Sequence, residues 1–319
     1  MPKPSARQGG KGVVPASGSP EVVDPRWLIR AFLAMVLVAL VCGYLTLCAL
    51  FYQGQWQFVL HPVRTSSPPA SVGGAPFQSV RFGPGPTGAP QLTGWWIPAS
   101  AGAEFAHLTI LYLPGGDGSL ASDQATLASL HDLGIAVFAI DYRGYGLSTD
   151  LRPSQWSMTE DAQTAWTYLT GSRAIPGNRI ILYGRGLGSA LALGLAAAKE
   201  SVPALIVDGP DFKVEERVRR DPRSRFLPLG LLFHDHFALL PALDQVKTPK
   251  LILSRSDSED PEVLRAADPK MTVALPPSAS SRYAPTVKRF LDLYAPPTSA
   301  PGVVPRPASP TVSTPAPGP

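Results

Sequence analysis

The residues whose types and spacing point most directly to chemistry form a glycine-rich corner, GRGLG at residues 184–188. A short apolar run precedes it and an alanine- and leucine-rich run of helical length follows it, which predicts a strand, a tight turn and a helix. A nucleophile elbow of the pattern G-x-S-x-G presents a serine hydroxyl on such a turn. Here Gly186 occupies the serine position, and Ser189 is expected in the first helical turn, facing elsewhere.

The same corner partly fits the dinucleotide-binding pattern G-x-G-x-x-G, in which glycines let a pyrophosphate approach the backbone. Gly184 and Gly186 match, and Ser189 stands where the third glycine would be. Asp208 ends a later apolar run and is plausibly placed for the acid that binds the ribose. On this stretch alone, a nucleophile elbow and a nucleotide site both remain open.

The composition limits the class of protein. With 319 residues and 45% hydrophobic content, the chain can bury one sizeable core, so one globular domain with appendages is expected. The net charge is +4 and no dense block of Lys and Arg occurs, so we exclude nucleic-acid binding. Both cysteines, Cys42 and Cys48, lie in an apolar segment near the N-terminus, which excludes disulfides and thiolate catalysis in the domain.

The N-terminal segment predicts a membrane anchor. Residues 1–26 are expected to be a disordered cytoplasmic tail and residues 27–51 a transmembrane helix, since the 21 residues from 31 to 51 would span about 31 Å. The segment is longer than the core of a cleaved signal peptide and has no small-x-small cleavage site. The positive-inside rule places the domain outside the cytoplasm, because the basic residues that flank the segment precede it: Lys3, Arg7, Lys11, Arg26 and Arg30.

The remaining residues are expected to form a linker, a domain and a tail. Residues 52–75 are a membrane-proximal linker, and residues 295–319, with nine prolines, a disordered tail. Within the domain, residues 76–294, apolar runs alternate with helical patterns and predict a mostly parallel sheet of eight strands with helices on both faces. The first two strands form a hairpin, and a small lid is expected near residues 211–247. The strands are expected at 77–82, 91–97, 108–113, 135–140, 180–183, 204–207, 250–253 and 271–275, and the helices near 120–132, 159–170 and 284–293.

Three strand ends carry a family resemblance. PGGDG follows the strand at 108–113, DYRGYGLS follows the strand at 135–140, and LYGRGLGSA contains the glycine-rich corner. Together these stretches resemble the α/β-hydrolase family, and within it the branch of serine hydrolases with a single N-terminal membrane anchor. The resemblance covers residues 58–293, and DYRGYGLS is its most specific part. A dinucleotide-binding protein has no use for that motif, and the corner falls on the third βα unit rather than the first.

The resemblance implies a site whose reactive side chains are substituted. The family uses a serine, a histidine, an orienting acid and backbone N–H donors for an oxyanion. Gly186 stands at the serine position and Ser280 at the histidine position, whereas Asp257 or Asp260 could match the acid. The N–H groups of Gly115, Gly116 and Leu187 remain as oxyanion donors, although Pro114 replaces the family's histidine.

The sequence therefore predicts a member of this family without the serine-triad mechanism, because loss of the serine or histidine costs about a millionfold in turnover. Such a protein would bind an acyl or other small ligand, or a protein partner. Two alternatives stay open: a hydrolase of non-standard mechanism, with Asp257 or Asp260 as base to a water, and a nucleotide-binding protein using Gly184, Gly186 and Asp208. His234 and His236 alone are a weak metal signature, so neither a metal nor a cofactor is expected.

Overall fold

The computed structural model describes residues 24–256 and 261–296, and the chain divides into two units between Phe51 and Tyr52. The first unit consists mainly of helix α1, which runs Pro25–Gly54 and so continues past the division. Among the described helices, α1 is long and apolar enough to cross a membrane, a test of length and composition that a signal sequence also passes. The predicted tails fall almost wholly outside the described residues.

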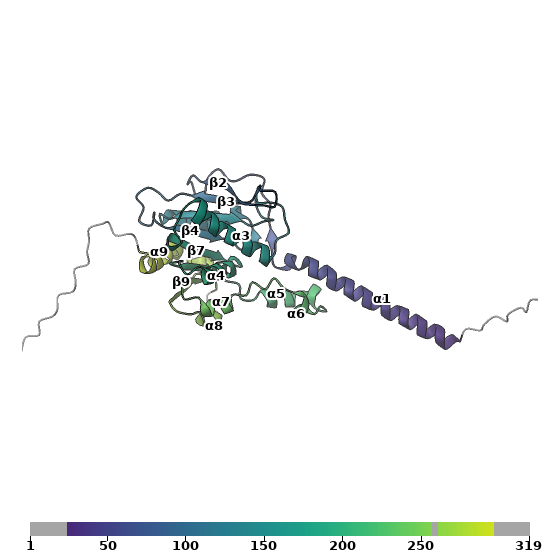
Figure 1. Cartoon of the computed structure of the whole chain (residues 1–319). Coiled ribbons are helices and arrows are strands. Elements are labelled where there is room, and N and C mark those ends of the chain that lie inside the picture. Colours follow the sequence, from purple (N-terminus) through teal and green to yellow (C-terminus); the bar gives the residue numbers. More distant parts are fainter. Residues whose placement is uncertain (1–23, 257–260, 297–319) are drawn as a thin grey trace, which may run out of the picture. The chain divides into compact units, whose positions relative to one another are not determined.

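The second unit is built on an eight-stranded sheet in the order β10-β9-β8-β7-β4-β6-β3-β2 (Figure 1). Its neighbouring strands are parallel except β2 with β3 and β3 with β6. The eight predicted strands and the antiparallel first pair are therefore confirmed. Their bounds are β2 (Gln78–Pro84), β3 (Pro90–Ile97), β4 (Thr109–Leu113), β6 (Ala136–Asp141), β7 (Ile180–Arg185), β8 (Leu205–Asp208), β9 (Lys250–Ser254) and β10 (Lys270–Ala274).

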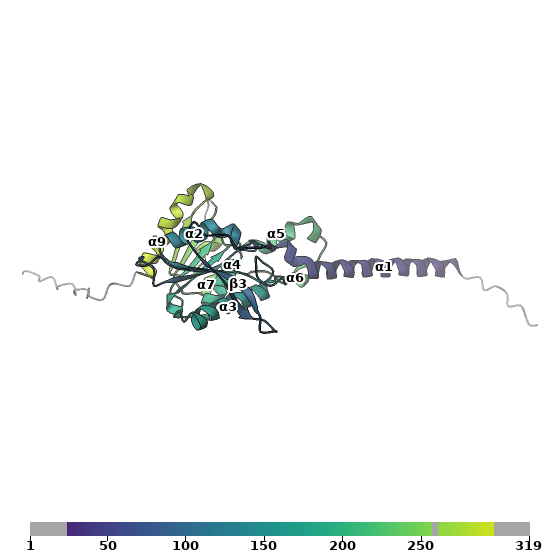
Figure 2. The same ribbon diagram turned by 90° about the horizontal axis from the view of Figure 1, so that it is seen from above.

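Helices cover both faces of the sheet, as Figure 2 shows: α2 and α9 lie on one face, and α3, α4 and α7 on the other. The central strands are buried on both faces, which explains why they are continuous apolar runs rather than alternating ones. Their bounds are α2 (Gln124–Asp132), α3 (Gln155–Thr167), α4 (Gly188–Ala198), α7 (Leu240–Gln245) and α9 (Tyr283–Tyr294).

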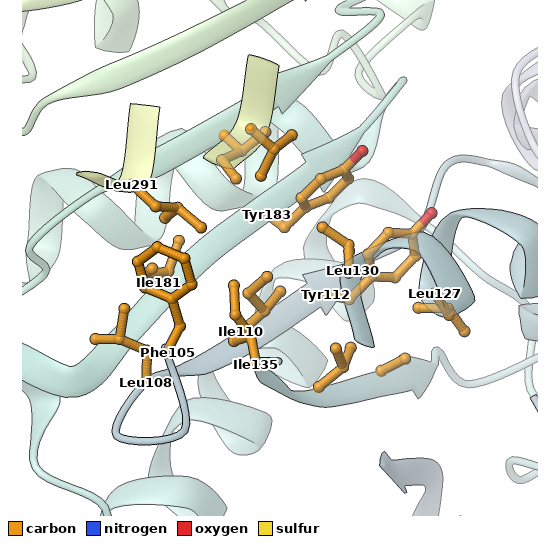
Figure 3. Close-up of a cluster of buried hydrophobic side chains, with 14 of the residues drawn as sticks. Phe105, Leu108, Ile110, Tyr112, Leu127, Leu130, Ile135, Ile181, Tyr183 and Leu291 are labelled. Atoms are coloured by element: carbon orange, nitrogen blue, oxygen red, sulfur yellow. The ribbon is translucent and has the colours of Figure 1, made fainter. Parts of the chain in front are cut away.

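The core beneath α2 and α9 combines alternate residues of the central strands with the apolar sides of these helices (Figure 3). Ile110 and Tyr112 of β4 point to this face, as do Ile181 and Tyr183 of β7, because side chains alternate along a strand. The rings of Tyr112 and Tyr183 stack with centroids 4.9 Å apart. Both hydroxyls lie at the same end of the cluster in Figure 3, toward the carboxyl ends of the strands.

Two further segments frame that end of the sheet. The predicted lid segment, residues 211–247, contains α5 (Val214–Arg220), the 3₁₀ turn Pro222–Ser224, α6 (Leu229–Leu232) and α7. Residues 52–75, which the sequence suggests as a linker, bury Val59, Leu60 and Val72. Within this stretch, β1 (His61–Pro62) pairs in parallel with β5 (Asp117–Gly118), a two-stranded sheet that the sequence does not predict.

Two glycines of α4 offer a matched test of this packing. Gly194 is exposed and a Cβ there would contact nothing, so Gly194→Ala is expected to stabilise the fold by about 0.5–1 kcal/mol through helix propensity. A Cβ on Gly188 would collide with the carbonyl oxygens of Leu113 and Pro114, so Gly188→Ala is expected to destabilise it by about 2–3 kcal/mol. Urea unfolding of the full chain in detergent, followed by circular dichroism, measures both. A neutral Gly188→Ala would contradict the close approach of α4 to the end of β4.

Candidate functional site

The glycine-rich corner forms the sharp turn that the sequence predicts between β7 and α4. Gly186 has a φ of +52°, the left-handed region that glycine adopts without strain. Its N–H donates to the carbonyl of Asp208 at 2.9 Å, and its own carbonyl accepts from Ser189 at 3.1 Å. A Cβ on Gly184 would lie 2.5 Å from the Gly188 carbonyl oxygen, so the strand and helix can approach this closely only with glycine there.

The nucleophile position is empty space. A Cβ built on Gly186 would meet only the Cα of Gly115, at 3.8 Å, so a side chain would fit. The neighbouring hydroxyl cannot replace it, because Ser189 is fully buried and donates to the Gly184 carbonyl at 3.0 Å. Gly186 borders a cavity of about 540 Å³ that is lined by Val59, Gly115, Gly116, Asp117, Gly118, Ser122, Asp123, Arg185, Leu187, Gly209, Pro210, Asp211 and Arg217.

The three expected oxyanion donors line this cavity together. Gly115, Gly116 and Leu187 lie outside the helices and strands, and their N–H groups donate to no acceptor in residues 24–256 and 261–296. Pro114 has no N–H to add. A carbonyl oxygen in the cavity could therefore accept hydrogen bonds from backbone groups that the fold leaves unused.

The DYRGYGLS motif holds these donors in place. Tyr142 donates its hydroxyl to the carbonyl of Pro114 at 3.1 Å, and Tyr145 donates to that of Gly116 at 2.9 Å. Both tyrosines are buried, and burial raises the pKa of each phenol. The two rings pack edge to face, with centroids 5.9 Å apart. The hydroxyls of the two tyrosines thus hold the carbonyls of the loop that carries Gly115 and Gly116.

Acidic residues beside the motif anchor the surrounding elements. The Asp141 carboxylate accepts from the N–H of Leu120 at 3.0 Å, and burial raises its pKa to about 6. The Arg143 guanidinium binds Asp161 at 2.6 Å and Glu160 at 2.9 Å on α3. The motif therefore links the carboxyl end of β6 to the oxyanion loop and to α3.

Ion pairs neutralise the charges of the cavity. Arg185 binds the carboxylate of Asp123, and Arg217 binds Asp211 at 2.6 Å. Burial raises the pKa of Asp123, while the Arg185 guanidinium opposes this shift. The same pairing raises the pKa of Arg185 despite its own burial. Neither arginine is thus a free positive charge toward a ligand.

Of the expected acid and histidine positions, Ser280 falls within the described residues, whereas Asp257 and Asp260 lie outside them. Ser280 is exposed and lines a second cavity of about 220 Å³, together with Asp208, Arg255 and Tyr283. The structure thus places the serine-equivalent and histidine-equivalent positions on different cavities.

Asp208 belongs to a buried network instead of a nucleotide site. It is 1% exposed, and its carboxylate pairs with the Arg255 guanidinium, whose Nε lies 2.8 Å from Oδ1. Tyr183 donates its hydroxyl to Asp208 at 2.7 Å, and Tyr283 donates to Tyr183 at 2.9 Å. Burial raises the pKa of both phenols. Asp208 is therefore unavailable to the ribose that the nucleotide-binding interpretation requires.

The structure adds a histidine and aspartate pair that sequence analysis missed. The register of β1 with β5 sets His61 opposite Asp117, and His61 Nδ1 lies 2.6 Å from Asp117 Oδ1. Asp117 lines the cavity of Gly186, and both side chains are largely exposed. The short apolar stretch before His61 forms a 3₁₀ helix and a turn, so no strand pattern in the sequence pointed to the pairing of His61 with Asp117.

His234 and His236 serve the lid segment. His234 Nδ1 lies 2.7 Å from Gln55 Nε2, and the His234 ring packs against Tyr52 with centroids 5.1 Å apart. His236 packs edge to face on Phe233. Within the described ranges, no group of three metal-ligating side chains gathers.

Comparison with known proteins decides the family. The sequence profile described as serine aminopeptidase, S33 (Hydrolase_4) matches residues 106–292, more than half of the chain. The chain belongs to this family of α/β hydrolases. The matched residues include Gly115, Gly186 and Ser280 but not His61. In the histidine and aspartate pair, Asp117 therefore lies within the matched region and His61 lies outside it.

The chain is also similar to curated proteins in sequence and to solved structures in fold. The chain is 32% identical over 193 residues to the uncharacterized protein Rv2307c of Mycobacterium tuberculosis, covering 58% of this chain and 66% of that protein. It is 29% identical over 156 residues to the α/β hydrolase domain-containing protein aho-3 of Caenorhabditis elegans, covering 48% and 44%. In fold, it is similar to the Pyrococcus furiosus esterase Pf2001, with a TM-score of 0.58, 17% identity and coverage of 74% and 98%.

The buried carboxyl of Asp141 predicts a pH dependence of stability. Its pKa of about 6 in the fold lies above the unfolded value of 3.8, so the folded state binds the proton more tightly. The resulting stability is fully present below pH 3.8 and is lost as the pH rises through 6. We expect Asp141→Asn to remove about 1 kcal/mol of the gain in unfolding free energy between pH 7 and pH 5.

Urea unfolding of the full chain in detergent at the two pH values measures this difference. Asp150→Asn, at an exposed position near the same loop, is the control and should leave the pH dependence unchanged. An identical pH dependence in Asp141→Asn and the natural chain would contradict the assignment.

Proposed function

We propose that this chain is a membrane-anchored member of the family that holds an acyl ligand without cleaving it by the serine mechanism. The observation that carries the proposal is Gly186, an elbow residue without a side chain beside an intact set of backbone donors. The loop at residues 276–281 contains no histidine, so a second member of the triad is also missing. The fold thus keeps the binding half of the site and lacks the reactive half.

The magnitude of the loss supports binding over turnover. Removing the serine or the histidine of a triad costs about a millionfold, and what remains is about 10³–10⁴ over water. The two losses overlap rather than add, so restoring one residue alone would not restore turnover. A cavity of about 540 Å³ is nevertheless of the size that small ligands occupy.

The charges of the cavity favour a neutral carbonyl compound, such as an ester or amide, over a free anion. Arg185 and Arg217 are each paired with an aspartate, so neither offers a free charge. The N–H groups of Gly115, Gly116 and Leu187 are the donors left for a ligand oxygen. A protein partner is the other occupant that the sequence suggests, and a cavity of about 540 Å³ favours the small ligand.

The N-terminal helix supports the anchor. Its apolar residues from 31 to 51 would cross about 31 Å, close to the thickness of the hydrocarbon core. Five basic residues precede it, and the next basic residue is Arg64. This asymmetry supports an N-terminus in the cytoplasm and a domain on the opposite side of the membrane.

A fluorophosphonate serine probe tests the proposal. We expect no adduct on the natural chain, and slow labelling of Gly186→Ser at a rate roughly a hundredfold above that of Gly194→Ser, because only the first serine would lie beside the oxyanion donors. Intact-mass spectrometry measures the adduct, and Gly194, exposed on α4, provides a serine of equal size without such donors. An excess of a medium-chain acyl ester should slow the labelling of Gly186→Ser by competing for the cavity.

Each result decides between functions. A stoichiometric adduct on the natural chain would reveal an activated serine and replace the proposal with an enzyme. Equal labelling of Gly186→Ser and Gly194→Ser would show that no oxyanion site is formed at the corner, which would overturn the ligand function.

The pair of His61 and Asp117 favours a second candidate function, hydrolysis with water as the nucleophile. Asp117 bonds to Nδ1 of His61, the arrangement that orients a histidine base and leaves its other nitrogen for a proton. In this reaction His61 takes a proton from water, the hydroxide adds to the carbonyl carbon, and the proton then passes to the leaving alkoxide or amine. Asp117 lines the cavity of Gly186 and His61 does not, so this reaction requires the His61 ring to turn toward the cavity.

The second candidate predicts that any ester hydrolysis by the natural chain falls about 10²–10⁴-fold in His61→Gln, because general base catalysis contributes that much. Hydrolysis of a chromogenic acyl ester measures the rate. His107→Gln, a histidine that precedes β4 at the opposite end of the strand, should leave the rate unchanged. If activity exists and survives His61→Gln, this base assignment fails.

A further inference from the structure

The lid segment, residues 211–247, exposes large apolar side chains next to arginines. Phe226 is 76% exposed and Leu231 is 86% exposed, more than is usual for such residues in a folded domain. Between residues 213 and 231 the sequence holds six basic and three acidic residues. The ion pairs in this stretch, such as Arg219 with Glu215 and Arg223 with Asp221, are exposed and therefore weak.

The same segment is clamped to the residues that follow the proposed membrane span. Gln55 is fully buried; it donates to the Leu232 carbonyl at 2.9 Å and accepts from the N–H of His234 at 3.0 Å. The Arg223 guanidinium lies over the ring of Phe58, 4.3 Å from its centroid. Gln55 therefore contacts the end of α6 and the residues after it, and Phe58 contacts the turn that follows α5.

Chain length then sets how far this region can lie from a bilayer. Gln55 is four residues beyond Phe51, where the proposed span ends, and four residues reach at most about 14 Å. Leu232 contacts Gln55 directly, and Leu231 is its neighbour in sequence. Since the headgroup layer adds several ångströms beyond the hydrocarbon core, the exposed side of α6 lies within reach of that layer.

We infer that the lid segment rests on the membrane surface, with Phe226 and Leu231 inserted among the lipids and the arginines beside anionic headgroups. An amphipathic surface of this kind sinks about 5–10 Å into the boundary between headgroups and acyl chains. Arginines near an anionic surface add electrostatic attraction to this apolar contact. The inference rests on the proposed anchor, because without it nothing tethers the segment to a bilayer.

The contact also bears on the ligand. Val59, shortly after Gln55, and Pro210, Asp211 and Arg217 at the start of the lid segment all line the cavity of Gly186. A lid segment lying in the headgroup layer would bring this wall of the cavity close to the acyl chains of the bilayer. The acyl ligand of the proposed function would then be a membrane lipid or a compound dissolved in the membrane.

Fluorescence quenching tests the contact in the full chain. Leu231→Cys, in a background with Cys42→Ser and Cys48→Ser, is labelled with a fluorophore and reconstituted into vesicles of phosphatidylcholine and phosphatidylglycerol. Brominated acyl chains are expected to lower its emission about twofold, because quenching needs contact at acyl-chain depth. Leu293→Cys on α9, also exposed, is the matched control and should keep its emission. Omitting phosphatidylglycerol should weaken the quenching at position 231.

The outcomes separate the anchor from the lid contact. Extraction of the chain from vesicles by alkaline carbonate would overturn the anchor and the lid contact that rests on it, while the serine-probe experiment tests the ligand function separately. A chain that resists extraction while its label at position 231 remains unquenched would overturn the lid contact alone and indicate a protein partner for Phe226 and Leu231. Equal quenching at positions 231 and 293 would also overturn the lid contact. Quenching that does not depend on phosphatidylglycerol would contradict the proposed role of the arginines in binding anionic headgroups.

Discussion

The close approach of α4 to the carboxyl end of β4 is the constraint on which the site depends. At Gly188 there is no room for a Cβ between the helix and the carbonyls of Leu113 and Pro114. Gly184 meets the same limit against the first turn of α4. This contact fixes the elbow and the oxyanion loop relative to each other, whatever residue stands between the two glycines. The geometry of an acyl site can therefore persist in a chain that lacks the nucleophile.

The polar residues of the DYRGYGLS stretch support this frame. Tyr142 and Tyr145 hold two carbonyls of the oxyanion loop, and Asp141 holds the N–H that begins the turn at Leu120. Since an unsatisfied buried polar group costs about 1–3 kcal/mol, these bonds are a condition of folding as well as of binding. The side chains of DYRGYGLS therefore stabilise the fold around the site, and they say nothing about turnover.

The sequence predicts the sheet well because its strands are short apolar runs bounded by turn residues, as at 108–113 and 135–140. The absence of a side chain at the nucleophile position can also be predicted from the sequence, because position 186 is a glycine. Contacts between residues far apart in the sequence cannot be predicted in this way. His61 contacts Asp117 only through a two-residue strand pair, and Asp208 contacts Arg255 only because β8 and β9 are neighbours. An acid 20 residues after a glycine-rich turn suggested a ribose ligand, and burial beside Tyr183 gave it a structural partner instead.

The left-handed conformation at Gly186 shows that the elbow is a property of the fold and not of the nucleophile. A serine in that conformation costs about 1 kcal/mol or more of backbone strain, whereas glycine adopts it freely. The turn keeps a φ of +52° even so, because the Gly186 N–H is bound to the Asp208 carbonyl and α4 must start within one residue. Glycine at this position therefore removes the strain together with the hydroxyl. What remains is a more relaxed corner with the same backbone donors, which is compatible with the proposed binding of a carbonyl group.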